Sequence, residues 1–146
     1  MKTEIKPFNE LSVQELYKSL ALRNEVFVVE QNCVYQDLDG YDDKALHVMI
    51  SEDDELVAYA RIFDKGIKYE TASIGRVVVS PSKRNLNLGR VLVNTAVEAI
   101  HNYFKTEEIT ISAQEHLQKF YAMHGFVTTS EMYLEDDIPH VEMQIK

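Results

Sequence analysis

The segment that most constrains the fold runs from Ile74 to Leu92, with the sequence IGRVVVSPSKRNLNLGRVL. Its first half is rich in β-branched residues and stops at Pro81, because proline cannot continue a strand inside a sheet. Apolar residues at helical spacing begin near Leu88. A strand that leads through a short basic loop into a helix is typical of an α/β domain. The opening of such a helix presents unpaired N–H groups and a partial positive charge, which together can hold a phosphate.

Three cations, Lys83, Arg84 and Arg90, stand in or beside this loop. They form a local positive patch in a chain with 15 Lys and Arg against 24 Asp and Glu, a formal net charge of −9. An ordinary strand-to-helix turn with solvated basic residues explains the same pattern, since a single phosphate-loop pattern is weak evidence. The segment alone therefore favours a phosphate site and a plain turn about equally.

Composition limits the classes of protein to consider. The 146 residues are 45% hydrophobic and 27% charged, which fits one globular domain over residues 1–146. The acidic balance argues against nucleic-acid binding, which needs clustered cations. No apolar run approaches the roughly 20 residues of a membrane span, and the N-terminus lacks the apolar core of a signal peptide. Cys33 is the only cysteine, so we expect no disulfide, no metal site and a cytoplasmic location.

The remaining pattern predicts strands and helices in mixed order, without repeats or linkers. Ser12 and Glu15 form a capping-box pattern, in which hydroxyl and carboxylate satisfy the first amides of a helix. Gly125 is expected to end a later helix. Strands are expected at about 2–7, 45–51, 55–63, 73–80, 109–113, 126–134 and 138–145. Helices are expected from Ser12, continuing or restarting over 26–30, and at 88–102 and 115–123.

The basic loop also carries a family resemblance. Arg84-x-x-Asn87-x-Gly89 resembles the Arg/Gln-x-x-Gly-x-Gly/Ala signature with which GNAT N-acetyltransferases cradle the pyrophosphate of acetyl-CoA. Asn87 stands where the family usually has its first glycine. Asparagine is the next most tolerant residue for a left-handed backbone, so the geometry of the loop can survive this departure.

Further segments narrow the resemblance. The helix ending in Phe120-Tyr121, followed by Gly125-Phe126, is similar to the other recurring segment of the family. Shorter matches to the bacterial ElaA-type acetyltransferases spread over nearly the whole chain, so the chain is identified as a member of this ElaA-like subfamily. The resemblance does not supply the acceptor. The matching segments are 27–33, 35–39, 58–62, 74–77 and 138–140.

The resemblance implies the GNAT acyl-CoA N-acyltransferase fold, an α/β (α+β) architecture. It has a central mixed, mostly antiparallel sheet of six or seven strands flanked by about four helices. Its fourth and fifth strands, here about 73–80 and 108–113, splay apart, and the freed backbone can pair with the pantetheine amides of acetyl-CoA. The cofactor-binding residues expected on this basis are Val77, Val78, Val79, Arg84, Asn85, Leu86, Asn87, Leu88, Gly89 and Arg90.

Acetyl transfer to an amine needs an acid and a base. The resemblance implies that Tyr121 is the general acid, since a phenol with a reference pKa near 10 keeps its proton at neutral pH. A free alkylamine has a pKa of about 10.4, so a base or a water path must take its proton. Glu30, Glu115, His116 and His140 are candidate bases by residue type. Imidazole is the side chain suited to gaining and losing a proton near neutral pH, and His140 follows Pro139, although a purely structural histidine fits the sequence equally well.

Arg61 and Arg76 lie within predicted strands, where a buried charge needs a partner. We interpret them first as structural ion pairs and second as substrate contacts. The acidic loop over residues 36–43 is expected to be solvated or to line the entry of the amine. The candidate partners of the two arginines are Glu30, Asp37, Asp39 and Asp42.

The predicted function is therefore transfer of acetyl from acetyl-CoA to a primary amine, by direct attack in a ternary complex. The acceptor would be a small molecule or a peptide, and a homodimer stays open. One alternative is a different acyl donor, because residues 22–27 resemble a segment of acyl-homoserine-lactone synthases; those usually follow it with a Trp-containing motif, and this chain has no Trp. Another is a non-catalytic CoA-binding sensor or partner module, against which the presence of Tyr121 argues.

Overall fold

Eight strands form one mixed sheet in the computed structural model, which describes residues 1–146 except for the side chains of residues 85 and 86. The spatial order is β1-β2-β3-β4-β5-β8-β6, with β7 paired to β8. Only β4 and β5 pair in parallel, which confirms the predicted mixed, mostly antiparallel sheet with eight strands in place of six or seven. The strands are β1 Lys2–Pro7, β2 Leu46–Glu52, β3 Glu55–Phe63, β4 Ala72–Val79, β5 Ile109–Gln114, β6 Val127–Thr128, β7 Tyr133–Glu135 and β8 Ile138–Ile145.

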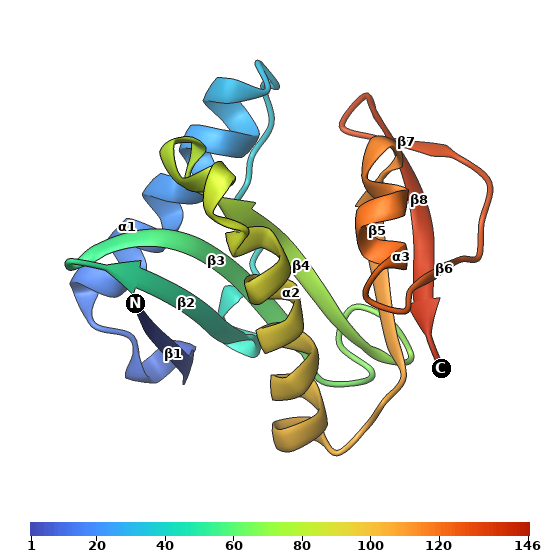
Figure 1. The fold of residues 1–146 in the computed structure, drawn as a ribbon, viewed down its shortest axis with the longest axis horizontal. Coiled ribbons are helices and arrows are strands. Elements are labelled where there is room, and N and C mark those ends of the chain that lie inside the picture. Colours follow the sequence, from blue (N-terminus) through green and yellow to red (C-terminus); the bar gives the residue numbers. More distant parts are fainter.

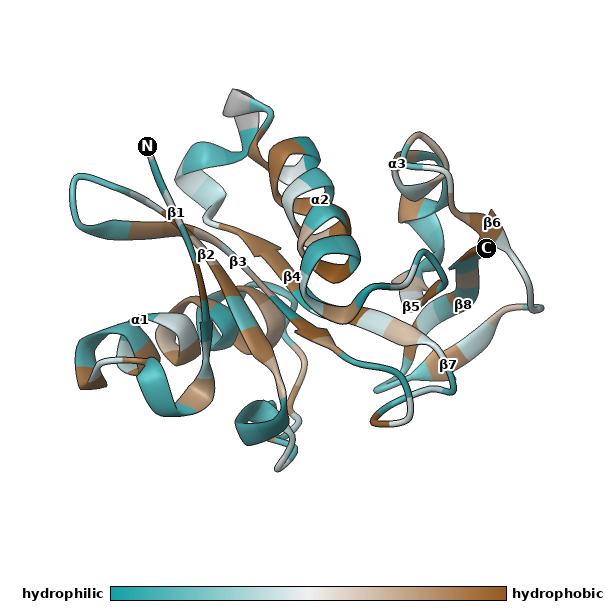
Figure 2. Cartoon of the chain, turned by 90° about the horizontal axis from the view of Figure 1, so that it is seen from below, coloured by the Kyte–Doolittle hydropathy of each residue, from teal (hydrophilic) through white to brown (hydrophobic). Residues whose placement is uncertain are grey.

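Three α-helices accompany the sheet, one fewer than expected: α1 Val13–Arg23, α2 Leu88–Ala99 and α3 Gln118–Ala122. The first two continue as π-helical turns, Asn24–Glu30 and Ile100–Phe104, so the predicted extension beyond α1 is confirmed. Figure 2 shows α1 and α2 on opposite faces of the sheet. Among the described residues, no helix is long and apolar enough to cross a bilayer.

The start of α1 is fixed locally by the predicted capping box. Ser12 Oγ accepts a hydrogen bond from the Glu15 N–H at 3.0 Å, and the Ser12 N–H donates to Glu15 Oε1 at 2.8 Å. Lys6, on β1, forms an ion pair with the same carboxylate, with 3.0 Å between its Nζ and Glu15 Oε2. Two orphan amides are thereby satisfied by residues three positions apart, which is why this helix boundary could be read from sequence.

Each face of the sheet carries its own hydrophobic cluster. The buried face of α2 packs on the central strands, and Figure 2 shows α2 lying along one face of the sheet. On the other face, Leu22 and Val26 from α1 and its extension pack against Tyr59 and Val78. Burying an amphipathic helix on each face fixes β3 and β4 at the centre of the sheet. The buried residues of α2 are Leu88, Leu92, Val93, Ala96 and Ala99.

The sheet opens between β4 and β5. The two strands pair only at Ala72 with Ile109 and Ser73 with Thr110, after which they diverge. Figure 1 shows β1 to β4 as one group of strands and β5 to β8 as another, with α2 beside the opening. Next to the divergence β4 carries one residue more than β3, and Arg76 there has a left-handed backbone with φ +49°. Such bulges bend a strand and concentrate at functional sites.

The run predicted as one strand over 126–134 was wrong. It forms two short strands, β6 and β7, which pair with opposite ends of β8. Between them Ser130 Oγ accepts the hydrogen bond of the Glu142 N–H at 2.9 Å, so a side chain replaces the strand ladder there. The β7–β8 turn is tight, because Asp136 and Asp137 both have left-handed backbones (φ +51° and +63°), as a two-residue hairpin requires.

Candidate active site

A cavity of about 400 Å³ lies where β4 and β5 separate. It draws its lining from both groups of strands and from the loops at their ends. Three of the predicted catalytic and cofactor-binding residues line it together: Val77, Tyr121 and His140. The resemblance had placed Val77 with the cofactor and Tyr121 with the chemistry, and the fold brings these positions to one cavity. Other polar lining residues include Cys33, Tyr35, Asp39, Arg61, Lys68, Tyr69, Arg76, Ser112, Glu135 and Asp136.

Tyr121 is held by aromatic neighbours from its own segment. Its side chain is 7% exposed and packs edge-to-face on Phe120 and Phe126, with ring centroids 5.1 and 5.9 Å away. Gly125, with φ +95°, turns the chain so that the Phe126 N–H bonds to the Tyr121 carbonyl at 3.3 Å. Burial raises the pKa of Tyr121 to about 12, because the phenolate would lose its hydration. The hydroxyl therefore keeps its proton at neutral pH.

His140 lies on β8, between Gln114 of β5 and Tyr133 of β7. Its Nδ1–H donates to the Ile138 carbonyl at 2.7 Å, which leaves the lone pair of the neutral ring on Nε2. Nε2 lies 3.5 Å from Glu135 Oε2, and the ring stacks on Tyr133. A proton accepted at Nε2 would meet a carboxylate at once, so the surroundings of this ring suit a base.

Glu135 belongs to a polar cluster that the sequence reasoning missed. Ser112 Oγ donates to Glu135 Oε1 at 3.2 Å, and it also lies 2.5 Å from the Tyr133 hydroxyl. The three residues come from β5 and β7, which pair with β8 on its two sides. No spacing within any one element brings them together, so only the hairpin geometry could have revealed the cluster.

Glu30 lies elsewhere. It forms a bidentate ion pair with Arg84, with oxygen to nitrogen distances of 2.6 and 2.8 Å, at the end of the helical turn that extends α1. The hydrogen bond from Arg84 holds the pKa of Glu30 below its usual range. Glu30 is not among the described residues that line the cavity. Of these two candidate bases, Glu30 therefore lies at the predicted pyrophosphate site. His140 lines the same cavity as Tyr121.

The segment predicted as a basic loop is a 3-10 helix, Pro81–Leu86. Asn87 follows with φ +61° and ψ +21°, the left-handed conformation anticipated for it, and α2 begins at Leu88. A Cβ on Gly89 would lie 3.4 Å from the Phe120 ring, so this position packs closely against α3. The predicted cofactor contacts of Asn85 and Leu86 involve side chains outside the described part of the chain.

The three cations of this segment differ in their partners. Lys83 pairs with Glu52 at 2.8 Å and Arg84 with Glu30. The Arg90 guanidinium is exposed, and its only contact in the described structure is with Met123 Sδ at 3.9 Å. Arg90 is therefore available to an anion at the N-terminus of α2, where helices generally present free amides.

Asn87→Ala is expected to lower the free energy of unfolding by about 1 kcal/mol, because a Cβ without a compensating side chain is disfavoured in the left-handed region. Asn87→Gly, the matched control, is expected to change it by less than about 0.5 kcal/mol, since glycine adopts this backbone freely. Urea unfolding followed by circular dichroism measures both. Equal losses in the two variants would show that the asparagine side chain, and not the backbone, matters.

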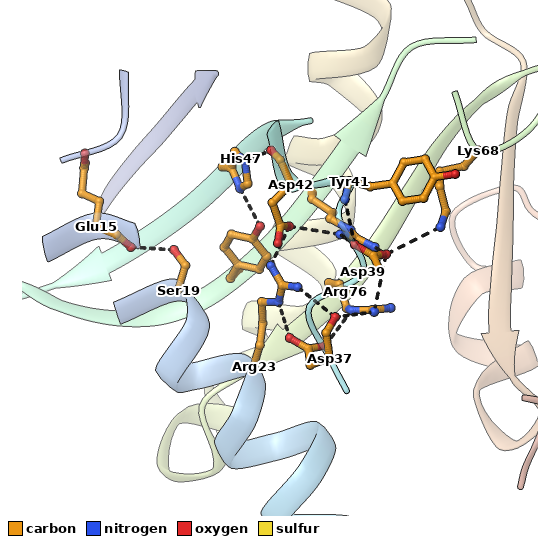
Figure 3. Close-up of polar contacts among 12 residues, drawn as sticks. Glu15, Ser19, Arg23, Asp37, Asp39, Tyr41, Asp42, His47, Lys68 and Arg76 are labelled. Atoms are coloured by element: carbon orange, nitrogen blue, oxygen red, sulfur yellow. Dashed lines mark hydrogen bonds and ion pairs between the residues drawn. The ribbon is translucent and has the colours of Figure 1, made fainter. Parts of the chain in front are cut away.

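Arg61 and Arg76 belong to a buried ion-pair network drawn in Figure 3. Arg61 Nη1 reaches Asp42 at 3.0 Å, and its Nη2 bonds Asp39. Arg76 Nε lies 2.7 Å from Asp37 Oδ1. Arg23 of α1 joins the network, reaching Asp37 and Asp42 at 2.8 Å each. The predicted ion pairs of the two arginines are confirmed, and their partners come from the acidic loop.

Acid is expected to destabilise the protein through this network. Burial alone would raise the pKa of Asp39 and Asp42, but hydrogen bonds and charge from Arg61 and Arg23 outweigh it, so both pKa values lie below the ordinary 3.9. Stability from these groups is complete above that unfolded value and is lost as pH falls toward the lowered folded values. Urea titrations should show unfolding free energy declining from about pH 5 to pH 2. Asp39→Asn should flatten the decline, and an unchanged slope would contradict the assignment.

No group of three or more His, Cys, Asp or Glu side chains is arranged as metal ligands in the part of the chain that the structure describes. Several polar groups at the cavity, among them Asp39, Arg61, Arg76 and Ser112, are instead hydrogen-bonded or ion-paired. The cavity lining contains a phenol, Tyr121, and an imidazole, His140. These groups suit it for acid–base chemistry on a bound molecule.

Known proteins are similar to this chain in sequence and in fold. Residues 9–146 match the family model of the acetyltransferase (GNAT) domain. Protein ElaA of Escherichia coli strain K12 is 44% identical over 137 residues, covering 92% of this chain and 90% of that protein. The crystal structure of an acyl-CoA N-acyltransferase from Pseudomonas aeruginosa has a TM-score of 0.94 at 41% identity and covers 100% of both chains. The AHL synthase LasI, with a TM-score of 0.72 at 16% identity over 99% of this chain and 88% of its own, shares the fold alone.

Proposed function

This chain belongs to the GNAT acetyltransferase family and to its ElaA-like subfamily, and we propose on that premise that it transfers acetyl from acetyl-CoA to a primary amine. The observation that carries the proposal is the cavity at the β4–β5 opening, which Tyr121 and His140 line together. The acyl-CoA specificity named for the P. aeruginosa neighbour supports the same donor class. We place the reaction in the cytoplasm, where the single cysteine would stay reduced.

The residues present fit a CoA thioester. Beyond Ser73, the β5-facing edge of β4 pairs with no strand, so its backbone groups can bond pantetheine amides. Val77, Val78 and Val79 would contribute mainly this backbone. The first turn of α2 and Arg90 would hold the pyrophosphate, as helix N-termini hold anions elsewhere. Arg84 would join them after releasing Glu30.

His140 serves as the base in this proposal. Its Nε2 takes a proton from the acceptor ammonium, and the freed nitrogen lone pair attacks the thioester carbonyl. The C–N bond forms, the C–S bond breaks, and sulfur departs with the bonding pair. The nitrogen of the new amide then loses its second proton to solvent. Glu135 stabilises the resulting imidazolium at 3.5 Å. Glu30 is the weaker candidate, because its ion pair with Arg84 lowers its basicity.

Tyr121 acts on the leaving sulfur. A thiol has a pKa near 8.5, so complete transfer from a phenol with a pKa of about 12 is uphill. We therefore propose that the hydroxyl donates a hydrogen bond as charge develops on sulfur, and that the thiol gains its proton from solvent afterwards. Stabilisation of developing charge in a buried site is worth more than in water.

The two alternative functions keep their own support. A different acyl donor is supported by the resemblance of residues 22–27 to a segment of AHL synthases and by the fold shared with LasI at 16% identity. A non-catalytic CoA-binding module would need no cavity with an acid and a base. The non-catalytic module leaves unexplained why Tyr121 and His140 line the same cavity.

The proposal is tested by free-thiol release from acetyl-CoA in the presence of a panel of primary amines, with calorimetry of coenzyme A binding alongside. Acceptor-dependent thiol release is the expected result. Binding of coenzyme A with no thiol release from any amine would favour the non-catalytic module. Release from a longer-chain acyl-CoA but not from acetyl-CoA would favour the different donor.

A further inference from the structure

The cavity is charged differently at its two sides, and from this we infer the class of acceptor. We propose that the acceptor is a free amino acid or a similar zwitterion, whose carboxylate binds at Lys68 and Arg76 while its amine faces His140. The inference rests on the proposed function, because it uses the same cavity, and it names the substrate class of that site.

The side built on β3, β4 and the preceding loop has an excess of positive charge. The ion-pair network there contains four cations, Arg23, Arg61, Lys68 and Arg76, against three carboxylates, Asp37, Asp39 and Asp42. In a chain with a net charge of −9, a cationic surplus at the edge of a cavity is unexpected from composition. Such a surplus favours a bound anion, since a partly buried charge is screened less than one on the surface.

Lys68 is the cation whose N–H donors form no hydrogen bond within the described part of the chain. Its nearest carboxylate oxygen, Asp39 Oδ2, lies 3.6 Å away, beyond ordinary hydrogen-bond distance. Its ammonium lies 4.2 Å from the centre of the Tyr41 ring, which stabilises the charge but satisfies no N–H donor. The side chain is 33% exposed and lines the cavity. Figure 3 shows Lys68 at the end of the network, beside Asp39.

Arg76 offers a second donor beside it. Its Nε and Nη2 are engaged by Asp37, at 2.7 Å to the carboxylate and 2.9 Å to the backbone carbonyl. Its Nη2 also lies 3.7 Å from Asp39 Oδ2, and its Nη1 donates no hydrogen bond within the described part of the chain. The left-handed backbone at this bulge, φ +49°, places Arg76 in the cavity lining in the middle of β4. An arginine in this strained position is more costly than glycine would be, which is understandable if its side chain is needed there.

The opposite side, built on β5, β7 and β8, is anionic. Glu135 and Asp136 line it together with His140, and Ser112 and Tyr133 hold the Glu135 carboxylate in place. An ammonium is attracted to these carboxylates and then loses its proton to His140 Nε2. A ligand with an amine and a carboxylate a few bonds apart matches both sides at once. A cavity of about 400 Å³ is also within the usual range for a small-molecule ligand.

The test compares matched acceptors in the thiol-release assay with acetyl-CoA: amino acids, their carboxamides and the corresponding decarboxylated amines. We expect kcat/KM for the free amino acid to exceed that for its carboxamide by about tenfold or more, since hydrogen bonds to charged groups exceed neutral ones in strength. Lys68→Gln should remove most of this difference by lowering the value for the amino acid alone. Lys65→Gln, an exposed lysine in the same loop, is the matched control and should leave both values unchanged.

Several results would overturn the inference. These are equal turnover of acid, amide and amine; a Lys68→Gln effect of the same size on all three; or preferential acetylation of peptide amides. If coenzyme A binds but no amine releases thiol, the proposed function fails. Calorimetry of amino acids with the CoA-loaded protein then tests separately whether the cavity binds a zwitterion. Binding that is weakened about tenfold by Lys68→Gln alone would then support the zwitterion site. If no amino acid binds, the inference is wrong.

Discussion

Tyr121→Phe is expected to lower kcat for thiol release about 100-fold, near the lower end of the range for acid catalysis. The lower end is expected because the raised pKa of this phenol limits it to hydrogen-bond donation, as argued above. The substitution removes one oxygen and keeps the ring that packs on Phe120 and Phe126. Folding and the affinity for coenzyme A should therefore be retained, which calorimetry measures.

Tyr69→Phe is the matched control, since Tyr69 also lines the cavity and the chemical change is the same. It is expected to alter kcat by no more than about threefold, because the mechanism gives its hydroxyl no role in the chemistry. An unchanged kcat in Tyr121→Phe, under conditions where chemistry limits the rate, would remove Tyr121 from the mechanism. A loss of the same size in both variants would point to general disturbance of the cavity.

Arg23→Met is expected to cost about 3–5 kcal/mol of unfolding free energy, the usual penalty for breaking a buried ion pair by removing one partner. Arg23 is 1% exposed and bonds both Asp37 and Asp42. Its loss would leave three buried or half-buried carboxylates to share Arg61 and Arg76. Because small domains are stable by roughly 5–15 kcal/mol, such a loss would consume a large part of the total.

Urea unfolding followed by circular dichroism measures this loss. Lys44→Met is the control, because Lys44 lies 3.6 Å from Asp43 with both side chains more than half exposed. An exposed pair of this kind contributes less than about 1 kcal/mol. A loss below about 1 kcal/mol in Arg23→Met as well would mean that water or rearranged side chains compensate the stranded carboxylates.

The network also couples stability to the acceptor site. Asp39 bonds Arg61 and lies close to Lys68, the residue proposed to bind the carboxylate of the acceptor. Substitutions at Asp39 are therefore expected to affect both folding and acceptor affinity, whereas Lys68→Gln should affect acceptor affinity alone. The distinction follows from burial, because Lys68 is the exposed end of the network.

The candidate site was only partly predictable. Tyr121 and the helix opening at Leu88 were found because each belongs to a short continuous motif. The Ser112–Glu135 hydrogen bond was not found, since the two residues are 23 positions apart and meet only through β5 and β7. Four carboxylates were candidate partners for Arg61 and Arg76. In the structure Asp37, Asp39 and Asp42 belong to the arginine network, whereas Glu30 pairs with Arg84.

The sequence by itself determined those features whose partners lie within a few residues of each other. The capping box of Ser12 and Glu15, the left-handed Asn87 and the turn at Gly125 are of this kind, because backbone sterics and local hydrogen bonds decide them. Only the tertiary structure decided how far β6 and β7 extend and which charges meet in the cavity. The ion pairs of Arg23 and Arg76 join residues 14 to 39 positions apart, and a contact over that separation exists only after the sheet has closed around it.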